Sequence, residues 1–158
     1  MPSEKTPFQR ARDIAYRYLS HRARSSHEVE KRLRERGVDE STLRQVLESL
    51  QKDKYVDDRS FARQWVECRS RNRFIGPFRL LRELQEKGIG EEIRAEAVRE
   101  FFRGPEEERD LALKAAEKRL RVSQGVEKEK LKGRLSRYLT GKGFSSEAVY
   151  FAINRLVK

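Results

Sequence analysis

Asp57 and Asp58, two adjacent aspartates, are by residue type the strongest candidates for chemistry in this chain. Neighbouring carboxylates can bind a metal ion or share a catalytic proton. Both roles need further ligands that converge on the pair, and the two histidines, His21 and His27, lie in an earlier part of the chain. The histidines are also off the spacing of three or four residues at which ligands pair on a helix. We therefore expect no metal site, no bound cofactor and two solvent-exposed histidines.

The remaining candidates for catalysis are equally isolated. Cys68 is the single cysteine, so it can form no disulfide within the chain and no thiolate metal site. It follows Trp65 by three residues on an expected helix, which predicts a buried side chain rather than a nucleophile. The sequence contains no glycine-rich loop of the kinds that bind phosphate. It thus predicts a protein that is not an enzyme.

Composition narrows the class of protein. Charged residues make up 40% of the 158 residues, Gly and Pro are few, and the formal net charge is +11. Such a composition is typical of solvent-exposed helices, and the charge favours a polyanionic partner. No stretch approaches the roughly 18 apolar residues of a membrane span, and the first residues lack the apolar core of a signal peptide. We expect an all-α protein of the cytoplasm that contacts no membrane.

A glycine that follows a helical pattern recurs three times, at Gly37, Gly88 and Gly143. Each lies in a similar stretch, namely "LRERGV", "LQEKGI" and "LTGKGF". Apolar residues before and after each glycine have the spacing of one helix face. A third apolar pattern recurs further upstream as "IAYRYL", "FARQWV" and "LALKAA". The chain is therefore one pattern of three helices written three times.

The repeats predict the domain organisation. We expect an N-terminal tail at 1–10 and three-helix repeats at 11–58, 59–104 and 105–158. Because each repeat alone has a thin core, neighbours should lean on one another in an elongated, curved array. The third repeat is the hardest to predict, since Ala115 takes the register position of Trp65. The expected helices span residues 11–23, 26–36, 40–52, 58–73, 77–87, 91–103, 106–122, 127–141 and 146–157.

The repeat register also suggests a role for the aspartate pair. Asp57 and Asp58 precede the first apolar residue of repeat two by the same distances as Glu107 and Glu108 precede that of repeat three. A carboxylate at a helix start accepts hydrogen bonds from free backbone N–H groups and offsets the helix dipole, which contributes roughly 0.5 to 2 kcal/mol. We therefore interpret both pairs as helix caps rather than as catalytic groups.

Positive charge gathers in three clusters, each expected at the end of the first helix of a repeat. Cations there can simply offset the helix dipole. Three clusters in register would instead line up along stacked repeats as a basic stripe, suited to a phosphate backbone or a filament. The candidate partner-binding or nucleic-acid-binding residues are Arg22 and Arg24, then Arg69, Arg71 and Arg73, then Lys118, Arg119 and Arg121.

Three stretches carry a family resemblance. "YLSHRARSSHEVEKRLRERGV", "YVDDRSFARQWV" and "IGPFRLLRELQEKGI" resemble the RecX regulatory proteins, bacterial modulators of the RecA recombinase. The resemblance covers residues 11–104 and is looser in the third repeat. It implies a curved molecule of three tandem three-helix repeats that lies in the groove of a RecA filament on single-stranded DNA. It also implies that this molecule limits filament growth, ATPase, strand-exchange and coprotease activities.

Two functions of different classes remain open at this point. The first is a non-catalytic, monomeric regulator that binds the RecA filament and acts in DNA repair, recombination and the SOS response. The second is a free-standing basic DNA-binding protein that affects recombination indirectly. Binding to bare DNA should fall steeply with salt because counterions are released, whereas a protein contact should persist better. Comparing bare DNA with a filament at one salt concentration therefore separates the two.

Overall fold

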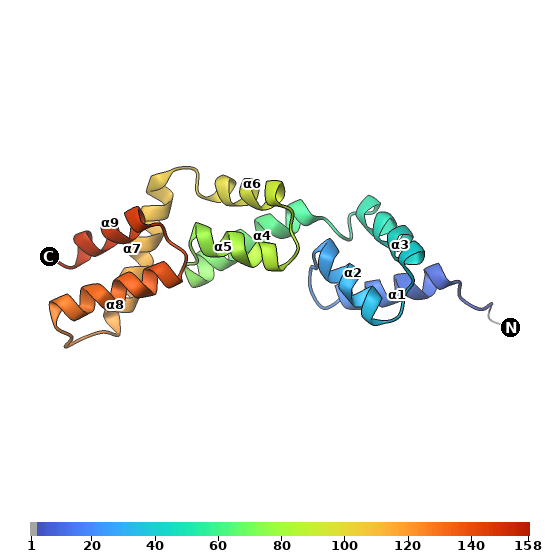
Figure 1. Cartoon of the computed structure of the whole chain (residues 1–158), viewed down its shortest axis with the longest axis horizontal. Coiled ribbons are helices and arrows are strands. Elements are labelled where there is room, and N and C mark those ends of the chain that lie inside the picture. Colours follow the sequence, from blue (N-terminus) through green and yellow to red (C-terminus); the bar gives the residue numbers. More distant parts are fainter. Residues whose placement is uncertain (1–2) are drawn as a thin grey trace.

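The computed structural model describes residues 3–158, and every regular element among them is a helix (Figure 1). The helices follow one another in three groups of three, so the expected all-α repeat fold is confirmed. Within the described residues, no helix is long and apolar enough to span a membrane. Repeat one holds α1 (Pro7–Leu19), α2 (Ser26–Glu35) and α3 (Glu40–Lys52); repeat two holds α4 (Asp58–Arg73), α5 (Pro77–Glu86) and α6 (Glu91–Phe101); repeat three holds α7 (Pro105–Arg121), α8 (Lys128–Gly141) and α9 (Ser146–Leu156).

The helix ends lie close to the predicted ones, except that α1 begins and ends earlier than 11–23. Thr6 accepts a hydrogen bond from the backbone N–H of Gln9, and the Gln9 side chain accepts one from the backbone of Thr6. This capping box, with Pro7 in the first helical position, sets the start of α1. The apolar spacing does not reveal it. The first helix therefore includes residues that the sequence assigned to a tail.

Each repeat buries its own hydrophobic core at the same register positions. An alanine on the first helix of each repeat is enclosed, since Ala15, Ala62 and Ala112 are at most 1% exposed. The apolar residues predicted to form one face of each middle helix are buried as well, which confirms the periodicity. Those residues are Val29 and Leu33, Leu80 and Leu84, and Leu135 and Leu139.

The three glycines of the repeat all lie in the left-handed region, with φ of +77° at Gly37, +75° at Gly88 and +96° at Gly143. Two of them also lie against the preceding repeat. A Cβ at Gly88 would lie 2.2 Å from the Cβ of His27, and one at Gly143 would lie 2.4 Å from the Cβ of Arg79. Nothing lies within 4 Å of the corresponding position at Gly37. Glycine therefore allows the left-handed turn in all three repeats. In repeats two and three it also allows the close contact with the preceding repeat.

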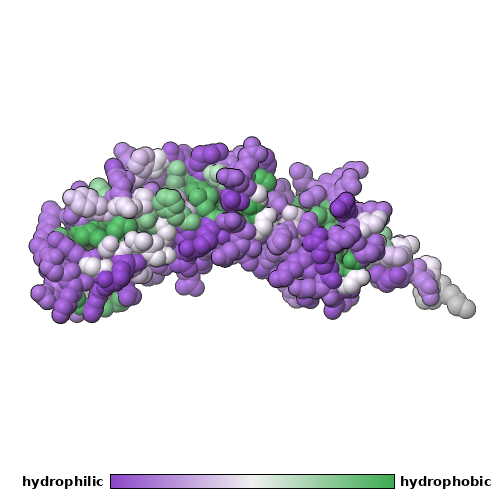
Figure 2. Space-filling view, viewed as in Figure 1, coloured by the Kyte–Doolittle hydropathy of each residue, from purple (hydrophilic) through white to green (hydrophobic). Residues whose placement is uncertain are grey.

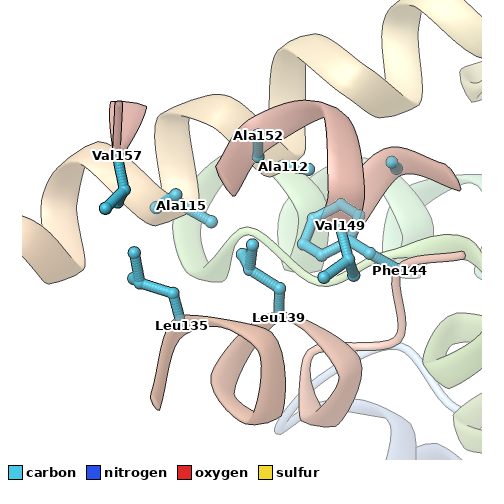
Figure 3. Close-up of a cluster of buried hydrophobic side chains, with 10 residues drawn as sticks. Ala112, Ala115, Leu135, Leu139, Phe144, Val149, Ala152 and Val157 are labelled. Atoms are coloured by element: carbon cyan, nitrogen blue, oxygen red, sulfur yellow. The ribbon is translucent and has the colours of Figure 1, made fainter. Parts of the chain in front are cut away.

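Repeat three builds its core from small side chains on two of its helices. Ala112, Ala115 and Ala116 of α7 are fully buried together with Ala152 of α9. Figure 3 shows Leu135 and Leu139 of α8 pointing toward these alanines. Small side chains allow helices to approach closely, so the volume that Trp65 supplies in repeat two is not needed here.

The repeats follow one another along the long axis, and the two ends of the chain lie at opposite ends of the molecule (Figure 1). Each helix packs mainly against helices of its own repeat. The space-filling outline is elongated, arches gently and narrows where repeat one meets repeat two (Figure 2). Short junctions between repeats therefore determine how the cores are placed relative to one another.

Candidate partner-binding surface

Repeats one and two meet through polar side chains, at a place termed here the first junction. It comprises the start of α2, with Ser25, Ser26 and Glu28, set against Asp58 and Lys87. The hydroxyl of Ser25 donates to the carbonyl of Lys87 at 2.6 Å. The backbone N–H and the hydroxyl of Ser26 donate to the two carboxylate oxygens of Asp58 at 2.8 and 2.6 Å. The ammonium of Lys87 lies 3.7 Å from the carboxylate of Glu28.

Repeats two and three meet through the backbone, at the second junction. Here the start of α5, with Gly76 and Phe78, lies on the turn formed by Lys142 and Gly143. The backbone N–H of Gly76 donates to the carbonyl of Lys142 at 2.7 Å, and that of Phe78 donates to the carbonyl of Gly143 at 3.0 Å. A Cβ at Gly76 would lie 2.7 Å from the carbonyl carbon of Gly143, so only glycine fits this approach.

An apolar side chain adds to the second junction. Phe74, the C-cap residue of α4, packs against the hydrophobic core of repeat three. Its backbone is left-handed, with φ of +56°, which is unusual for a residue other than glycine. The second junction therefore combines main-chain hydrogen bonds with a shared core residue, and the first junction has neither.

The aspartate pair divides into two roles. Asp57 caps α4 as predicted, because its Oδ1 accepts a hydrogen bond from the backbone N–H of Ser60 at 3.2 Å. Asp58 instead turns its carboxylate toward Ser26 of the preceding repeat. The register comparison could not reveal this contact, since it joins residues of two different repeats.

The cap predicted for repeat three is wrong. α7 begins at Pro105 and its N-cap residue is Gly104, so Glu107 and Glu108 lie in the first turn, as predicted, but neither side chain caps the helix. Glu108 accepts a hydrogen bond from the backbone N–H of Ser145 at 2.7 Å. Because Ser145 is the N-cap of α9, this carboxylate ties two helices of one repeat together.

The first basic cluster lies in the loop after α1 rather than at a helix end, because α1 stops at Leu19. Arg22 pairs with Glu28 at 2.6 Å. Arg24 stacks over the ring of Tyr18 at 3.9 Å, and its side chain is only 13% exposed. Partial burial raises the pKa of Glu28, but hydrogen bonds from Arg22 and the Ser25 backbone and the charge of Lys87 outweigh it and hold the pKa below its ordinary value. Both arginines of this cluster thus pair with the same carboxylate.

The second cluster occupies the last turns of α4, as predicted. Arg69 is half-buried and forms an ion pair with Glu83, with 2.8 Å between Nε and a carboxylate oxygen. Arg71 is exposed and lies 3.2 Å from Glu67 one turn away. Arg73 is exposed as well. The three arginines therefore differ in their surroundings. Arg69 forms a half-buried ion pair, whereas Arg71 and Arg73 face solvent.

The third cluster lies at the end of α7, also as predicted, and its side chains are exposed. The ammonium of Lys118 lies 5.5 Å from the ring centre of Phe74, the residue that links repeats two and three. The guanidinium of Arg119 lies 5.1 Å from the ring centre of Tyr138 on α8. Arg121 is the last residue of the helix. Part of this cluster thus borders the second junction.

The structure adds two cations that the sequence analysis missed, Arg79 and Lys142. The Lys142 ammonium donates to the carbonyl of Arg73 at 2.9 Å, and Arg79 donates to the carbonyl of Gly141 at 3.3 Å. A signal was present, because lysine precedes the repeat glycine in both later repeats, as Lys87 and Lys142. We term the following set the junction cations: Arg69, Arg73, Arg79, Lys118 and Lys142.

The junction cations act on one another. Partial burial lowers the pKa of Lys142, and the charges of Arg79, Arg69, Lys118 and Arg73 lower it further. Only one carboxylate, that of Glu83, pairs with any of them within residues 3–158. The structure therefore brings members of the second and third clusters together, while Arg22 and Arg24 lie at the other junction.

The other candidates for chemistry are separate from this surface. Both histidines, His21 and His27, are exposed as expected. Cys68 is exposed too, so the prediction of a buried thiol is wrong: the helix turns Val66 inward instead, and Asn72 donates to the sulfur at 3.3 Å. Over the part of the chain that the structure describes, no three His, Cys, Asp or Glu side chains are grouped so that they could hold a metal ion.

Comparison with known families matches every repeat. Residues 11–50 match the first three-helix domain of RecX, residues 57–98 the second and residues 106–153 the third. The order of the three domains is that of the repeats described above.

Individual relatives agree with these matches. A regulatory protein RecX from Amycolatopsis mediterranei is 32% identical over 96% of this chain and 87% of its own length. One from Bacillus licheniformis is 36% identical over 94% of this chain, which spans only 54% of that relative. The crystal structure of RecX from Lactobacillus salivarius shares the fold with a TM-score of 0.84 at 22% identity, covering 95% of this chain and 96% of that one. A second crystal structure of a regulatory protein RecX has a TM-score of 0.81 at 27% identity, covering 94% and 72%.

Proposed function

Because the chain belongs to the RecX family of regulatory proteins, we propose that it is a non-catalytic regulator of the RecA recombinase. In this proposal it binds the RecA filament on single-stranded DNA and limits filament growth, ATPase, strand-exchange and coprotease activities. It acts as a monomer in the cytoplasm, needs no cofactor and contacts no membrane.

The match of all three repeats, in order, to the RecX domains is the observation that carries this proposal. The shape and charge of the molecule support it. An elongated array of repeats can lie along an extended partner, and a net charge of +11 favours a partner that carries many negative charges. A nucleoprotein filament has both properties.

The three basic clusters should contribute unequally. Arg22 and Arg24 are already paired with Glu28, so a partner gains little by meeting them. Arg73 and Lys118 are exposed and pair with no carboxylate within residues 3–158, so their charge is available. We expect Arg73→Gln with Lys118→Gln to weaken inhibition of the RecA filament far more than Arg22→Gln does.

The test is the rate of ATP hydrolysis by RecA on single-stranded DNA, measured with increasing amounts of the parent and of each variant. The parent should lower the rate, and the Arg73 and Lys118 variant should need a several-fold higher concentration to do so. A parent that leaves RecA activity unchanged at all concentrations would contradict the proposal. Circular dichroism and melting of each variant establish that any loss is not a loss of folding.

A free-standing DNA-binding protein is the second candidate, and the junction cations are the observation that favours it. The two candidates differ in what salt does to binding. If the protein binds bare DNA as tightly as it binds the filament, and both fall equally steeply with salt, DNA alone accounts for binding. Tighter and less salt-dependent binding to the filament supports a contact with RecA itself.

A further inference from the structure

At the second junction the cations outnumber the carboxylates that pair with them. Arg69 and Arg79 lie near Glu83, but Arg73, Lys118 and Lys142 pair with no carboxylate within residues 3–158. Lys142 is half-buried and hydrogen-bonds only to a backbone carbonyl. Like charges held close together destabilise a folded protein unless a counter-charge is present. The arrangement is therefore suited to an anion from outside the chain.

The first junction provides an internal comparison. Glu28 of α2 and Arg79 of α5 occupy the same register position, nine residues before Gly37 and Gly88. At the first junction the carboxylate of Glu28 pairs with three cations, Arg22, Arg24 and Lys87. At the second junction a guanidinium stands in its place and adds to the cations there. This reversal of charge at one position adds two positive charges to the second junction relative to the first.

An exposed aromatic side chain, that of Phe78, lies in the first turn of α5, the helix that carries Arg79. Phe78 lies directly before Arg79 at the start of α5, and it is 62% exposed although its backbone is fixed to Gly143 by a hydrogen bond. An exposed ring in a positively charged region is the arrangement on which the bases of a single strand stack. A base in a duplex has no free face for such a ring, and an acidic protein surface does not require one.

We infer that the second junction is a binding site for single-stranded DNA, in which the junction cations contact successive phosphates and the ring of Phe78 stacks on a base. This inference rests on the proposed function, because it identifies the strand with the DNA of the filament. The site also joins two repeats, so a bound strand would bridge them.

The test uses the full-length protein and a labelled single-stranded oligothymidylate, with binding followed by fluorescence anisotropy at several salt concentrations and without RecA. Arg73→Gln with Lys118→Gln removes two phosphate contacts from exposed side chains that form no ion pair within residues 3–158. We expect at least a tenfold loss of affinity. The slope of log affinity against log salt should become shallower by about 1.4, at about 0.7 for each contact on a single strand.

Phe78→Ala provides a distinct signature. Loss of stacking should weaken binding about tenfold at every salt concentration, because no counterion is involved, and should leave the salt slope unchanged. The matched control is Lys128→Gln with Lys130→Gln, which removes the same charge from the opposite end of α8. At about 1.5 Å of rise per residue, that end lies about 20 Å from Lys142. The control should bind like the parent.

Each outcome decides the inference. Equal losses in the control and in the Arg73 and Lys118 variant would show general attraction to the polyanion and overturn the site. Variants that bind DNA like the parent but no longer inhibit RecA would show that the cations meet an acidic protein surface, which also overturns it. A parent that inhibits RecA without binding the oligonucleotide leaves the proposed function intact and removes this site. A parent that binds as described but does not affect RecA keeps the site and removes the proposed function.

Discussion

The two junctions use the same positions of the repeat but join them by different chemistry. In both, the start of a middle helix lies on the turn after the middle helix of the next repeat. Ser25 reaches the carbonyl of Lys87 through its hydroxyl, whereas Gly76 reaches the carbonyl of Lys142 through its backbone N–H. The hydrogen bonds of the first junction therefore depend on side chains that can be exchanged or titrated. The second depends on a close approach of main chains, which only glycine permits.

The largest expected effect comes from the glycines of the turns. Gly143→Ala places a methyl group against the backbone of Arg79 in addition to straining a left-handed residue, so we expect about 3 kcal/mol or more of lost stability. Gly37→Ala meets no neighbour and should cost about 1 kcal/mol. Urea unfolding of both variants measures the difference. Equal losses would show that packing between repeats two and three contributes little.

Replacing Asp58 at the first junction should cause the next largest loss of stability. Asp58→Ala leaves the N–H and hydroxyl of Ser26 without an acceptor and should cost about 2 kcal/mol, against about 1 kcal/mol for loss of the Asp57 cap. Asparagine at both positions keeps one amide oxygen that can accept from the backbone N–H, so it should cost less and leave inhibition of RecA intact. Hydrogen exchange at the start of α2 should quicken in Asp58→Ala alone. Faster exchange there in Asp57→Ala as well would contradict the division of roles.

Replacing the arginines at the end of α4 should cost different amounts of stability, because the arginines differ in burial. Arg69→Ala breaks a half-buried ion pair with Glu83 and should destabilise by about 1 to 2 kcal/mol. Arg71→Ala removes an exposed pair with Glu67 and should cost about 0.3 kcal/mol. Thermal and urea unfolding of the single variants provide the comparison. If both cost the same, the pairing with Glu83 is not structural.

The smallest effect is a dependence on pH at the first junction. Because the pKa of Glu28 is lower in the folded protein than its ordinary value of 4.5, its contribution to stability is present above that value and is lost as the pH falls through the folded pKa. The melting temperature of Glu28→Gln should therefore fall below that of the parent at pH 7, and the gap should close near pH 3. A gap that stays constant would mean that Glu28 is not the titrating group.

The repeated elements could be predicted from the sequence because each rests on local spacing. The positive φ of Gly37, Gly88 and Gly143 follows from a glycine after an amphipathic helix, and the structure confirms it. The apolar pattern predicts a start of α1 that is too late, because the capping box at Thr6 and Gln9 precedes that pattern. Local patterns thus fix the middle of a helix better than its ends.

The contacts between repeats could not be predicted, because they join residues far apart in the chain. Asp58 resembles a helix cap in sequence, and only the structure shows that its carboxylate holds Ser26. Arg79 and Lys142 lie outside the runs of basic residues, so a search for clusters along the chain passes over them. Aligning the repeats with one another, rather than scanning for runs, would have shown that Glu28 is exchanged for Arg79.

The backbone of Phe74 has a consequence for how the protein unfolds. A left-handed conformation costs a residue with a side chain roughly 1 to 2 kcal/mol, and here it directs the ring into the core of repeat three. Repeat two therefore keeps this strain only while repeat three is folded beside it, so the two should melt in one cooperative step. Repeat one shares no core residue with its neighbour and can open by itself. In a stacked-repeat description, the coupling energy between neighbours is large on one side of repeat two and small on the other.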